Sequence, residues 1–299
     1  MKPASFKYLS PDSLDDALAA TAQHGAEAKL IAGGQSLIPA MNFRVLQPAV
    51  LVDLNPLTEL NYIRPGDDGG MRIGAMTRLR QLERDPLAAA RAPLLHAALP
   101  HVAHAQIRNR GTLGGSLVHA DPAAELPVVT LALAARYRVQ NTAGWRWIDS
   151  STFFNGFFDT AIEPDEIMVE IALPPMAART GCAFLEVARR HGDYAMAGVA
   201  ALVTLDESGV CQRARLVYLN LGDAPLDAQA AAGLLIGEKQ SDELAAAVAA
   251  KAAEEEIMPM GSVHASIDYQ QHLARVLTCR ALNQAFARAD EWRMTNDES

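Results

Sequence analysis

The first part of the chain combines a helical spacing of apolar residues with two short apolar runs. Ser13 is followed three residues later by an acid, and the apolar positions beyond it repeat at helical spacing until Gly25. The runs at 30–32 and 50–54 are typical of buried strands. The pattern therefore predicts a compact α/β lobe over about residues 1–55.

The next region, about residues 56–176, changes to hairpins around a helical centre. Apolar runs at 61–63 and 71–73 flank a turn rich in glycine and aspartate, which predicts a hairpin. Thr77 is expected to cap a helical region that extends to about residue 105, and 125–135 has the composition of a buried helix. Further strands are expected at 137–139, 145–148 and 166–171. We interpret this region as a second lobe.

A proline-rich stretch at 174–181 has no apolar periodicity and is the predicted domain boundary. Three strand-like segments follow it, at 183–188, 195–205 and 214–221, and the chain after Pro225 is helical and rich in alanine. Strands followed by helices predict an α+β domain over 177–288, with a three-stranded antiparallel sheet and a helical bundle. Its last helix spans about 269–287, and residues 289–299 form a polar tail.

Composition narrows the class of protein. The chain has 299 residues, enough for two domains, and a net charge of −9, which argues against nucleic acid as a partner because phosphate binding needs a basic surface. No apolar run approaches the length that spans a bilayer, and the N-terminus lacks the apolar core of a secretory signal. We expect a cytoplasmic protein with no membrane span.

Cysteine usage argues against a metal centre within this chain. The three cysteines are scattered and form no CxxC pair, so neither a zinc site nor an iron–sulfur site is predicted. The chain also lacks the HExxH, GxSxG and GxxxxGK[ST] motifs and a GxGxxG motif after a strand. Two glycine-rich turns remain as candidates for chemistry.

The first turn, which we call the first glycine segment, follows a predicted strand. It consists of Ala32, Gly33, Gly34, Gln35, Ser36 and Leu37. Paired glycines permit positive φ, so that successive backbone N–H groups can converge on an anionic oxygen, and a helix starting at Ser36 would add its positive end. A tight strand-to-helix turn that binds nothing is the alternative interpretation.

The second turn, the second glycine segment, consists of Thr112, Leu113, Gly114, Gly115 and Ser116. We expect the amides of Gly114 and Gly115 to hold a second phosphate, with Asp121 or Glu125 accepting from ligand hydroxyls. Each segment alone is a weak signal, but the two together indicate a diphosphate-containing cofactor held between two lobes.

Charged residues near the second glycine segment have competing interpretations. His101, His104 and His119 are interpreted as a polar surface rather than as ligand contacts. Arg108 and Arg110 either neutralise a diphosphate or pair with acids of this acidic protein.

Three stretches together resemble a known family. AGGQSLIP, QIRNRGTLGGSLVHADPAAELP and ARRHGDYA are similar to the motifs of the FAD-binding medium subunit of molybdenum hydroxylases, the xanthine dehydrogenase and carbon monoxide dehydrogenase family. The resemblance extends from Phe6 to about Phe286. It implies an α+β fold, with a two-lobed FAD-binding domain of the vanillyl-alcohol-oxidase/PCMH-like type over 1–176. A C-terminal domain of the carbon monoxide dehydrogenase flavoprotein type would follow over 177–288.

The resemblance also assigns roles to residues. Both glycine segments would wrap the FAD pyrophosphate, and Asp121 matches the acid of the family's ADP tripeptide. Glu125 matches a second acid near the cofactor, Met168 lies on a strand with backbone contacts to the isoalloxazine, and Tyr194 matches an aromatic beside the ring. Leu185 stands where some relatives have a lysine, and Val102 where others have an aromatic residue. These two differences change the expected environment of the flavin ring, and with it the expected redox behaviour and electron acceptor.

The function implied is electron transfer. The flavin would take electrons from [2Fe-2S] clusters of a small subunit and deliver them to an external acceptor, while a large subunit with the molybdenum cofactor oxidises the substrate. A dimer of heterotrimers is expected from the resemblance. A stand-alone FAD oxidoreductase that acts directly on a small molecule, and an assembly protein whose glycine turns bind nothing, are the alternatives.

Overall fold

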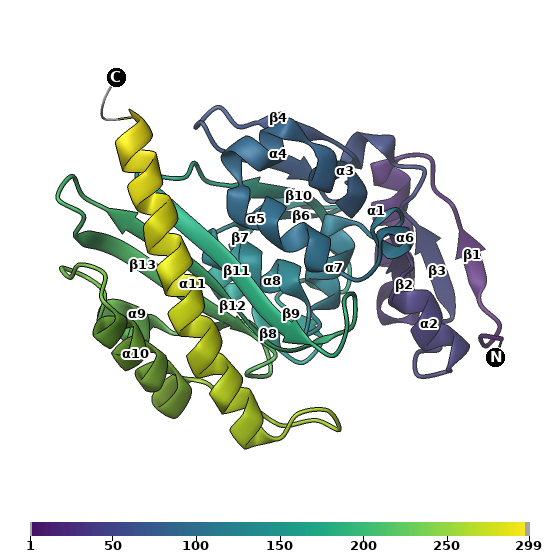
Figure 1. The fold of residues 1–299 in the computed structure, drawn as a ribbon. Coiled ribbons are helices and arrows are strands. Elements are labelled where there is room, and N and C mark those ends of the chain that lie inside the picture. Colours follow the sequence, from purple (N-terminus) through teal and green to yellow (C-terminus); the bar gives the residue numbers. More distant parts are fainter. Residues whose placement is uncertain (1, 297–299) are drawn as a thin grey trace.

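The computed structural model describes residues 2–296, which form an N-terminal lobe, a second lobe and a C-terminal region, each with its own sheet (Figure 1). The N-terminal lobe contains a parallel sheet in the order β1-β3-β2. Its elements are β1 (Lys7–Leu9), α1 (Leu14–His24), η1 (Gly25–Glu27), β2 (Ala28–Ile31), α2 (Leu37–Asn42) and β3 (Val50–Asp53). The predicted helix start is confirmed, because Ser13 accepts from the backbone N–H of Asp16 and Gly25 ends α1 at φ +49°.

A second lobe is built on an antiparallel sheet in the order β4-β5-β10-β6-β7. Its strands and short helical turns are η2 (Thr58–Leu60), β4 (Ile63–Pro65), β5 (Met71–Gly74), β6 (Arg136–Asn141), β7 (Gly144–Asp149), η4 (Ser150–Thr152), the β8 (Phe154–Gly156) and β9 (Asp159–Thr160) pair, and β10 (Ile167–Leu173). Its helices are α3 (Leu79–Arg84), α4 (Pro86–Arg91), α5 (Pro93–Ala98), η3 (Leu99–His101), α6 (Ala105–Arg108), α7 (Leu113–His119) and α8 (Glu125–Ala132).

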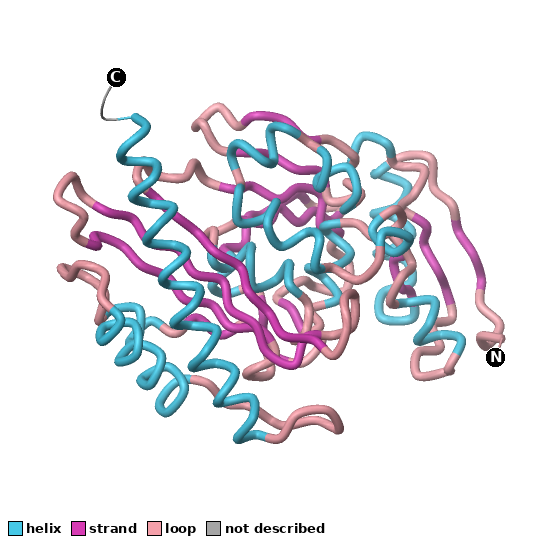
Figure 2. The backbone as a smooth tube through the Cα atoms, in the orientation of Figure 1, coloured by secondary structure: helices cyan, strands magenta, loops and turns pink. Residues whose placement is uncertain are grey.

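The C-terminal region is a sheet covered by helices. Strands β11 (Thr180–Ala188), β12 (Ala195–Leu205), β13 (Cys211–Leu219) and β14 (Leu226–Asp227) pair antiparallel in chain order. The helices are α9 (Gln229–Gly233), α10 (Asp242–Lys251), the π-helical turn η5 (Ala252–Glu256) and α11 (Ile267–Asn296), which crosses the sheet obliquely (Figures 1 and 2).

The structure corrects three expectations. The region 77–105 is a series of short helices rather than one, because Pro86, Pro93 and Pro100 each lie at the start of a new helix. The N-cap of α3 is Arg78 instead of Thr77. The C-terminal sheet has four strands where three were predicted, and the helices pack as a layer on it instead of forming a separate bundle. The last helix continues to Asn296 through the predicted tail, while residues 297–299 lie outside the described part.

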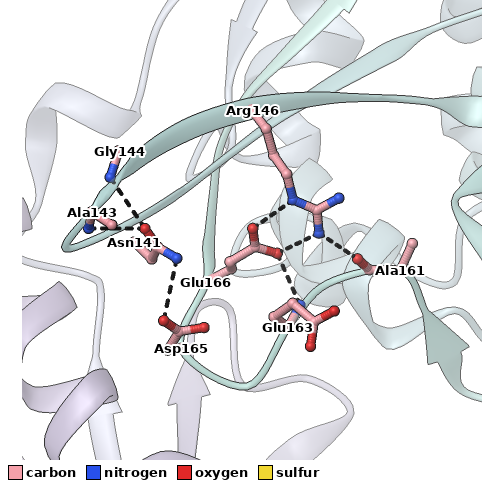
Figure 3. Close-up of polar contacts among 8 residues, drawn as sticks. All are labelled: Asn141, Ala143, Gly144, Arg146, Ala161, Glu163, Asp165 and Glu166. Carbon is pink, nitrogen blue, oxygen red and sulfur yellow. Dashed lines mark hydrogen bonds and ion pairs between the residues drawn. The ribbon is translucent and has the colours of Figure 1, made fainter.

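One polar cluster fixes the loop that leads into β10 (Figure 3). Arg146 on β7 donates to both carboxylate oxygens of Glu166 at 2.7 Å and to the carbonyl oxygen of Ala161 at 2.8 Å. The backbone N–H of Glu163 donates to the same carboxylate at 2.9 Å. Because Glu166 precedes β10 directly and is buried, these bonds fix the register of the strand that carries Met168.

Candidate cofactor-binding site

The first glycine segment lines a cavity through Ala32, Gly33, Gly34 and Gln35. It follows β2 and leads into α2, and Gly34 has φ +71°, a conformation that glycine adopts at no steric cost. Within residues 2–296, no protein group accepts from the backbone N–H groups of Gly33, Gly34, Gln35 or Ser36. A loop with unpaired amides beside a cavity fits an anionic ligand.

The cavity has a volume of about 480 Å³, which is within the range of small-molecule and cofactor sites. Besides the first glycine segment, the adjoining Ile31, Ile38 and Pro39 line it. Three other parts of the chain contribute Tyr8, Asp53 with Asn55, and Arg110. Arg110 supplies a positive charge and Asp53 a carboxylate, so the lining offers partners for both phosphate oxygens and hydroxyl groups.

A side-chain network supports the floor of this cavity. Asn55 donates to the carbonyl oxygen of Ala32 at 2.9 Å, and its own amide oxygen accepts from Arg78 at 2.5 Å. Arg78 also donates to the carbonyl oxygen of Arg110, and the Tyr8 hydroxyl donates to Asp53. Burial, together with the charge of Arg110, lowers the pKa of Arg78. The network connects the first glycine segment to the turn before the second one.

The two glycine segments lie side by side. A Cβ placed on Gly33 would lie 2.4 Å from the carbonyl oxygen of Arg110 and 2.8 Å from the Cα of Gly111. A Cβ on Gly115 would lie 3.5 Å from the Cβ of Ala32. Only glycine permits the approach at position 33, because the neighbouring atoms belong to the backbone and cannot move aside easily.

The second glycine segment differs from the expectation in how its amides are used. The N–H of Gly114 donates to the carbonyl oxygen of Ala75 at 2.9 Å, and the N–H of Gly115 donates to the hydroxyl oxygen of Thr112 at 3.1 Å. Thr112 is therefore the N-cap of α7 and is buried. Ser116 and Leu113 likewise donate within the chain. The amides of this segment are bonded within the second lobe, whereas those of the first segment are unpaired.

Met168 lies close to the second glycine segment through the backbone. It is buried on β10, next to a bulge between Met168 and Glu170 in the pairing with β6. The neighbouring Val169 accepts at its carbonyl oxygen from the N–H of Ala75, whose own carbonyl oxygen accepts from Gly114. Strand β10 and α7 are thus joined through the backbone of Ala75.

A second group of predicted residues gathers at the start of α8. Glu125 is buried, and desolvation, followed by the nearby charge of Glu186, raises its pKa to about 8. Asp121 accepts from the backbone N–H of Ala123 at 2.9 Å in the turn that precedes it. Tyr194 is 70% exposed in front of β12, and its pKa is raised by partial burial and then by the charges of Asp121 and Glu125. These three residues share one electrostatic environment.

Leu185 and Val102, the two departures from the family pattern, occupy different cores. Leu185 packs partly buried against the cluster under α10 and α11, and Val102 packs against the cluster that includes α5 and α8. Neither side chain carries charge; burial is the main influence on Glu125, and the nearby charges that act on it are those of Glu186, His101 and Asp121.

Several lining residues were not identified from the sequence. Tyr8 lies within β1, Asp53 ends β3 and Asn55 follows it. Only the parallel pairing of β3 with both β1 and β2 brings these residues to the first glycine segment. For Asp53 and Asn55 the available signal was their position at the carboxyl end of the strand predicted at 50–54, because the carboxyl ends of parallel strands are common ligand positions.

Neither a metal site nor a membrane helix is found in the part of the chain that the structure describes. No cluster of three or more histidine, cysteine, aspartate or glutamate side chains has a metal-ligand arrangement there. None of the helices between residues 2 and 296 combines the length and apolarity needed to cross a bilayer.

A mixed α/β fold with a glycine-lined cavity that suits a diphosphate defines a dinucleotide-binding protein, and comparison with known families specifies which. Residues 4–176 match the FAD-binding domain in molybdopterin dehydrogenase, and residues 182–285 match the C-terminal domain of carbon monoxide dehydrogenase flavoprotein. The chain belongs to the family of FAD-containing medium subunits of molybdenum hydroxylases. The resemblance inferred from the three motifs is confirmed.

Curated relatives cover nearly the full length. The chain is 44% identical over 289 residues to the 6-hydroxypseudooxynicotine dehydrogenase complex subunit alpha of Paenarthrobacter nicotinovorans, covering 97% of each chain. It is 37% identical to the carbon monoxide dehydrogenase medium chain of Hydrogenophaga pseudoflava, covering 96% of this chain and 99% of the relative.

Solved structures agree in fold. The carbon monoxide dehydrogenase of Hydrogenophaga pseudoflava, in a form that lacks the Mo-pyranopterin moiety, superposes with a TM-score of 0.93 at 37% identity, covering 96% of this chain and 99% of the other. Quinoline 2-oxidoreductase from Pseudomonas putida 86 superposes with a TM-score of 0.92 at 36% identity, covering 97% and 99%.

Proposed function

We propose that the first glycine segment and Arg110 bind the diphosphate of FAD in the cavity of about 480 Å³. The observation that carries this assignment is the row of unpaired amides at Gly33 to Ser36 beside a single arginine. The second glycine segment supports the cavity from behind, where the buried Thr112 caps α7. Asp121, Glu125, Met168 and Tyr194 surround the ring end, in the two-lobed vanillyl-alcohol-oxidase/PCMH-like arrangement.

The bound FAD supplies electron transfer, and the chain positions it. In this proposal the ring accepts electrons from [2Fe-2S] clusters of a small subunit and passes them to an external acceptor. The substrate is oxidised at the molybdenum cofactor of a large subunit, and two such trimers associate in the cytoplasm. Residues 1–176 hold the cofactor, and residues 177–288 complete the ring side. The stand-alone oxidoreductase is not favoured, because relatives of this length are subunits of larger complexes.

Arg110→Gln tests the assignment of the cavity. Loss of one charge-assisted bond to phosphate is expected to weaken FAD binding about tenfold, which corresponds to about 1.4 kcal/mol, measured by fluorescence titration of the apoprotein. Arg280→Gln, on the exposed side of α11, is the matched control and should bind FAD like the wild type. Equal affinity in wild type and Arg110→Gln would place the diphosphate elsewhere.

Co-purification tests the subunit role. Expression together with its neighbouring genes should yield a complex that contains this chain, an iron–sulfur chain and a molybdenum chain, with one FAD per copy of this chain. A yellow protein that oxidises a small molecule without partners would support the stand-alone alternative instead.

A further inference from the structure

Arg78 joins the two lobes beneath the cavity, although it is not among the lining residues. It directly precedes α3, and its partly buried guanidinium donates through two nitrogens to acceptors in different lobes. Nη2 donates to Oδ1 of Asn55 in the N-terminal lobe at 2.5 Å, and Nη1 donates to the carbonyl oxygen of Arg110 in the second lobe. The planar fork of an arginine can hold two such acceptors in fixed positions.

The backbone places this guanidinium independently of the contacts that the side chain makes. The N–H of Arg78 donates to Oε1 of Gln81 at 3.0 Å, and its carbonyl oxygen accepts from the N–H of Leu82 at 3.2 Å. The next N–H, that of Leu79, donates to the carbonyl oxygen of Gly111 at 2.9 Å. Replacement of the Arg78 side chain should therefore leave the course of the chain intact at this point.

Asn55 extends the reach of Arg78 to the first glycine segment. Its Nδ2 donates to the carbonyl oxygen of Ala32 at 2.9 Å, while its Oδ1 accepts from Arg78. A trans peptide is planar, with its C=O and N–H pointing in opposite directions, so a fixed carbonyl at Ala32 also fixes the N–H of Gly33. The described residues provide no acceptor for this N–H, and Gly33 lines the cavity. The bond from Asn55 therefore orients one of the amides assigned to the diphosphate.

The bond from Arg78 to the carbonyl oxygen of Arg110 has a second effect. That oxygen lies against Gly33, since a Cβ built there would be 2.4 Å from it. A carbonyl oxygen carries partial negative charge and, without a donor, would repel a phosphate held at the neighbouring amides. The charged donor offsets this repulsion and holds the backbone of Arg110, which lines the cavity.

We propose that Arg78 is a positioning residue for the diphosphate of FAD. It holds the carbonyl oxygen of Arg110 directly and that of Ala32 through Asn55, and it thereby orients donors of both lobes toward one ligand. The inference rests on the proposed function, because it requires the diphosphate to lie at the first glycine segment. It adds a residue outside both glycine segments and outside the cavity lining to those that determine FAD affinity.

FAD titration of Arg78→Ala, Asn55→Ala and the double variant tests the proposal, with the full chain and flavin fluorescence as the signal. Arg78→Ala is expected to weaken FAD binding about tenfold or more, because a charged donor to two acceptors is lost. Since Arg78 acts on Ala32 through Asn55, the double variant should bind FAD about as weakly as Arg78→Ala alone. Single losses that multiply fully in the double variant, or wild-type affinity in Arg78→Ala, would overturn the proposal.

Arg91→Ala is the matched control. Arg91, at the end of α4, is also partly buried and also donates to two carbonyl oxygens, those of Gly69 at 3.0 Å and Gly70 at 2.9 Å. None of these three residues lines the cavity. Urea unfolding should show similar losses of stability for Arg91→Ala and Arg78→Ala, while Arg91→Ala binds FAD like the wild type. Equal losses of FAD affinity would mean that Arg78 acts through general stability, which contradicts a positioning role.

Chemical rescue separates the position of the guanidinium from packing. Methylguanidinium at millimolar concentration should restore FAD affinity to Arg78→Ala, whereas methylammonium should not, because only the guanidinium can donate to both acceptors in one plane. Recovery with both cations, or with neither, would count against the proposal. If circular dichroism shows that Arg78→Ala does not fold, Arg78→Lys takes its place. Lysine keeps the charge without the fork, so weaker FAD binding is expected and wild-type affinity would overturn the role.

A failure of this role can be told from a failure of the proposed function. A wild type that binds no FAD would overturn the proposed function, and unchanged affinity in Arg110→Gln would overturn the assignment of the cavity. Where the wild type binds FAD and Arg110→Gln binds it more weakly, normal binding by Arg78→Ala would overturn the positioning role alone.

Discussion

Gly33 lies in contact with the turn before the second glycine segment. Its replacement tests whether close packing at this position, rather than the loss of any glycine, determines stability. In Gly33→Ala the new methyl group would meet the carbonyl oxygen of Arg110 at 2.4 Å, so one segment must shift. We expect the free energy of unfolding to fall by about 1–3 kcal/mol, measured by urea unfolding, and FAD content to decrease. The control Gly233→Ala, where a Cβ meets nothing within 4 Å, should change stability by less than about 0.5 kcal/mol.

Valine at Gly34 and at Gly114 tests the difference between the two glycine segments, whose amides are unpaired in the first and bonded within the chain in the second. Gly34→Val introduces a branched side chain at φ +71°, where the nearest atoms are the side chains of Ile31 and Ile38. We expect loss of FAD from a chain that still folds. Gly114→Val, by contrast, would place Cβ 2.7 Å from the carbonyl oxygen of Ala75 and should destabilise the chain itself. Equal unfolding midpoints for the two variants would contradict this difference.

Because of Glu125, the free energy of unfolding is expected to fall as the pH rises. Its carboxyl keeps a proton until about pH 8 in the folded chain, whereas an unfolded glutamate releases it near its ordinary value of 4.5. The folded state therefore binds more protons between these values, so its stability is complete below pH 4.5 and is lost as pH rises towards 8. The loss approaches about 1.4 kcal/mol per pH unit at most.

Glu125→Gln should remove this dependence. Urea unfolding of the chain without FAD at pH 6, 7 and 8 is expected to show a smaller loss of stability for the variant than for wild type. Parallel curves for the two proteins would mean that Glu125 titrates alike in the folded and unfolded chain.

At the scale of elements, capping residues and apolar alternation correctly predicted the helix and strand boundaries that depend on neighbouring residues. The boundaries of α1 follow from Ser13 and Gly25, and β12 spans the predicted 195–205, because capping and alternation act within a few residues. Thr77 was misinterpreted as a helix cap because its hydroxyl bonds the backbone of Tyr62 instead, a contact across the fold that the sequence around Thr77 does not encode.

In the candidate site too, the features set by local sequence were predicted, whereas those set by contacts across the fold were not. The first glycine segment is visible in the sequence because paired glycines are needed for its turn. Asp53 and Asn55 reach the cavity only through the parallel pairing of β2 with β3. The use of the Gly114 amide by Ala75 is equally non-local, and motif reasoning alone therefore assigned it to a ligand.

The pairing of α3 with α6 depends on Glu83 of α3, which pairs with the buried Arg108 of α6 and, at 2.7 Å, with Arg80 of its own helix. Arg108 donates from Nε and Nη2 to the two carboxylate oxygens of Glu83, each at 3.0 Å, and from Nη1 to the carbonyl oxygens of Val102 and Ala103. Glu83→Gln removes the negative partner and leaves the guanidinium buried. We expect a loss of about 3–5 kcal/mol in the free energy of unfolding.

The control for this variant is Glu255→Gln, which breaks an exposed ion pair with Lys251. It should lower the free energy of unfolding by less than about 1 kcal/mol. Chemical denaturation of both variants provides the comparison. Similar losses in the two would show that Arg108 finds solvent or another acceptor when Glu83 is neutral.

At the scale of the whole molecule, the C-terminal sheet is shared between two cores. One face contributes Phe184, Ala200 and Val217 to the cluster built from α5, α8 and the second lobe. The other face contributes Val199 and Tyr218 to the cluster under α10 and α11. The two regions matched by separate family models are therefore joined by apolar packing rather than by a flexible linker.

Shared packing predicts that the regions unfold together. A chain cut after residue 176 would expose the apolar face of α5 and α8, so neither region is expected to persist once the other has opened. Differential scanning calorimetry of the full chain with FAD should give one transition, with calorimetric and van't Hoff enthalpies that agree. Two resolved transitions, or a van't Hoff enthalpy well below the calorimetric one, would show that the interface between the sheet and α8 opens independently. In that case the second lobe would have to hold the ring end of the cofactor without support from β11 and β12.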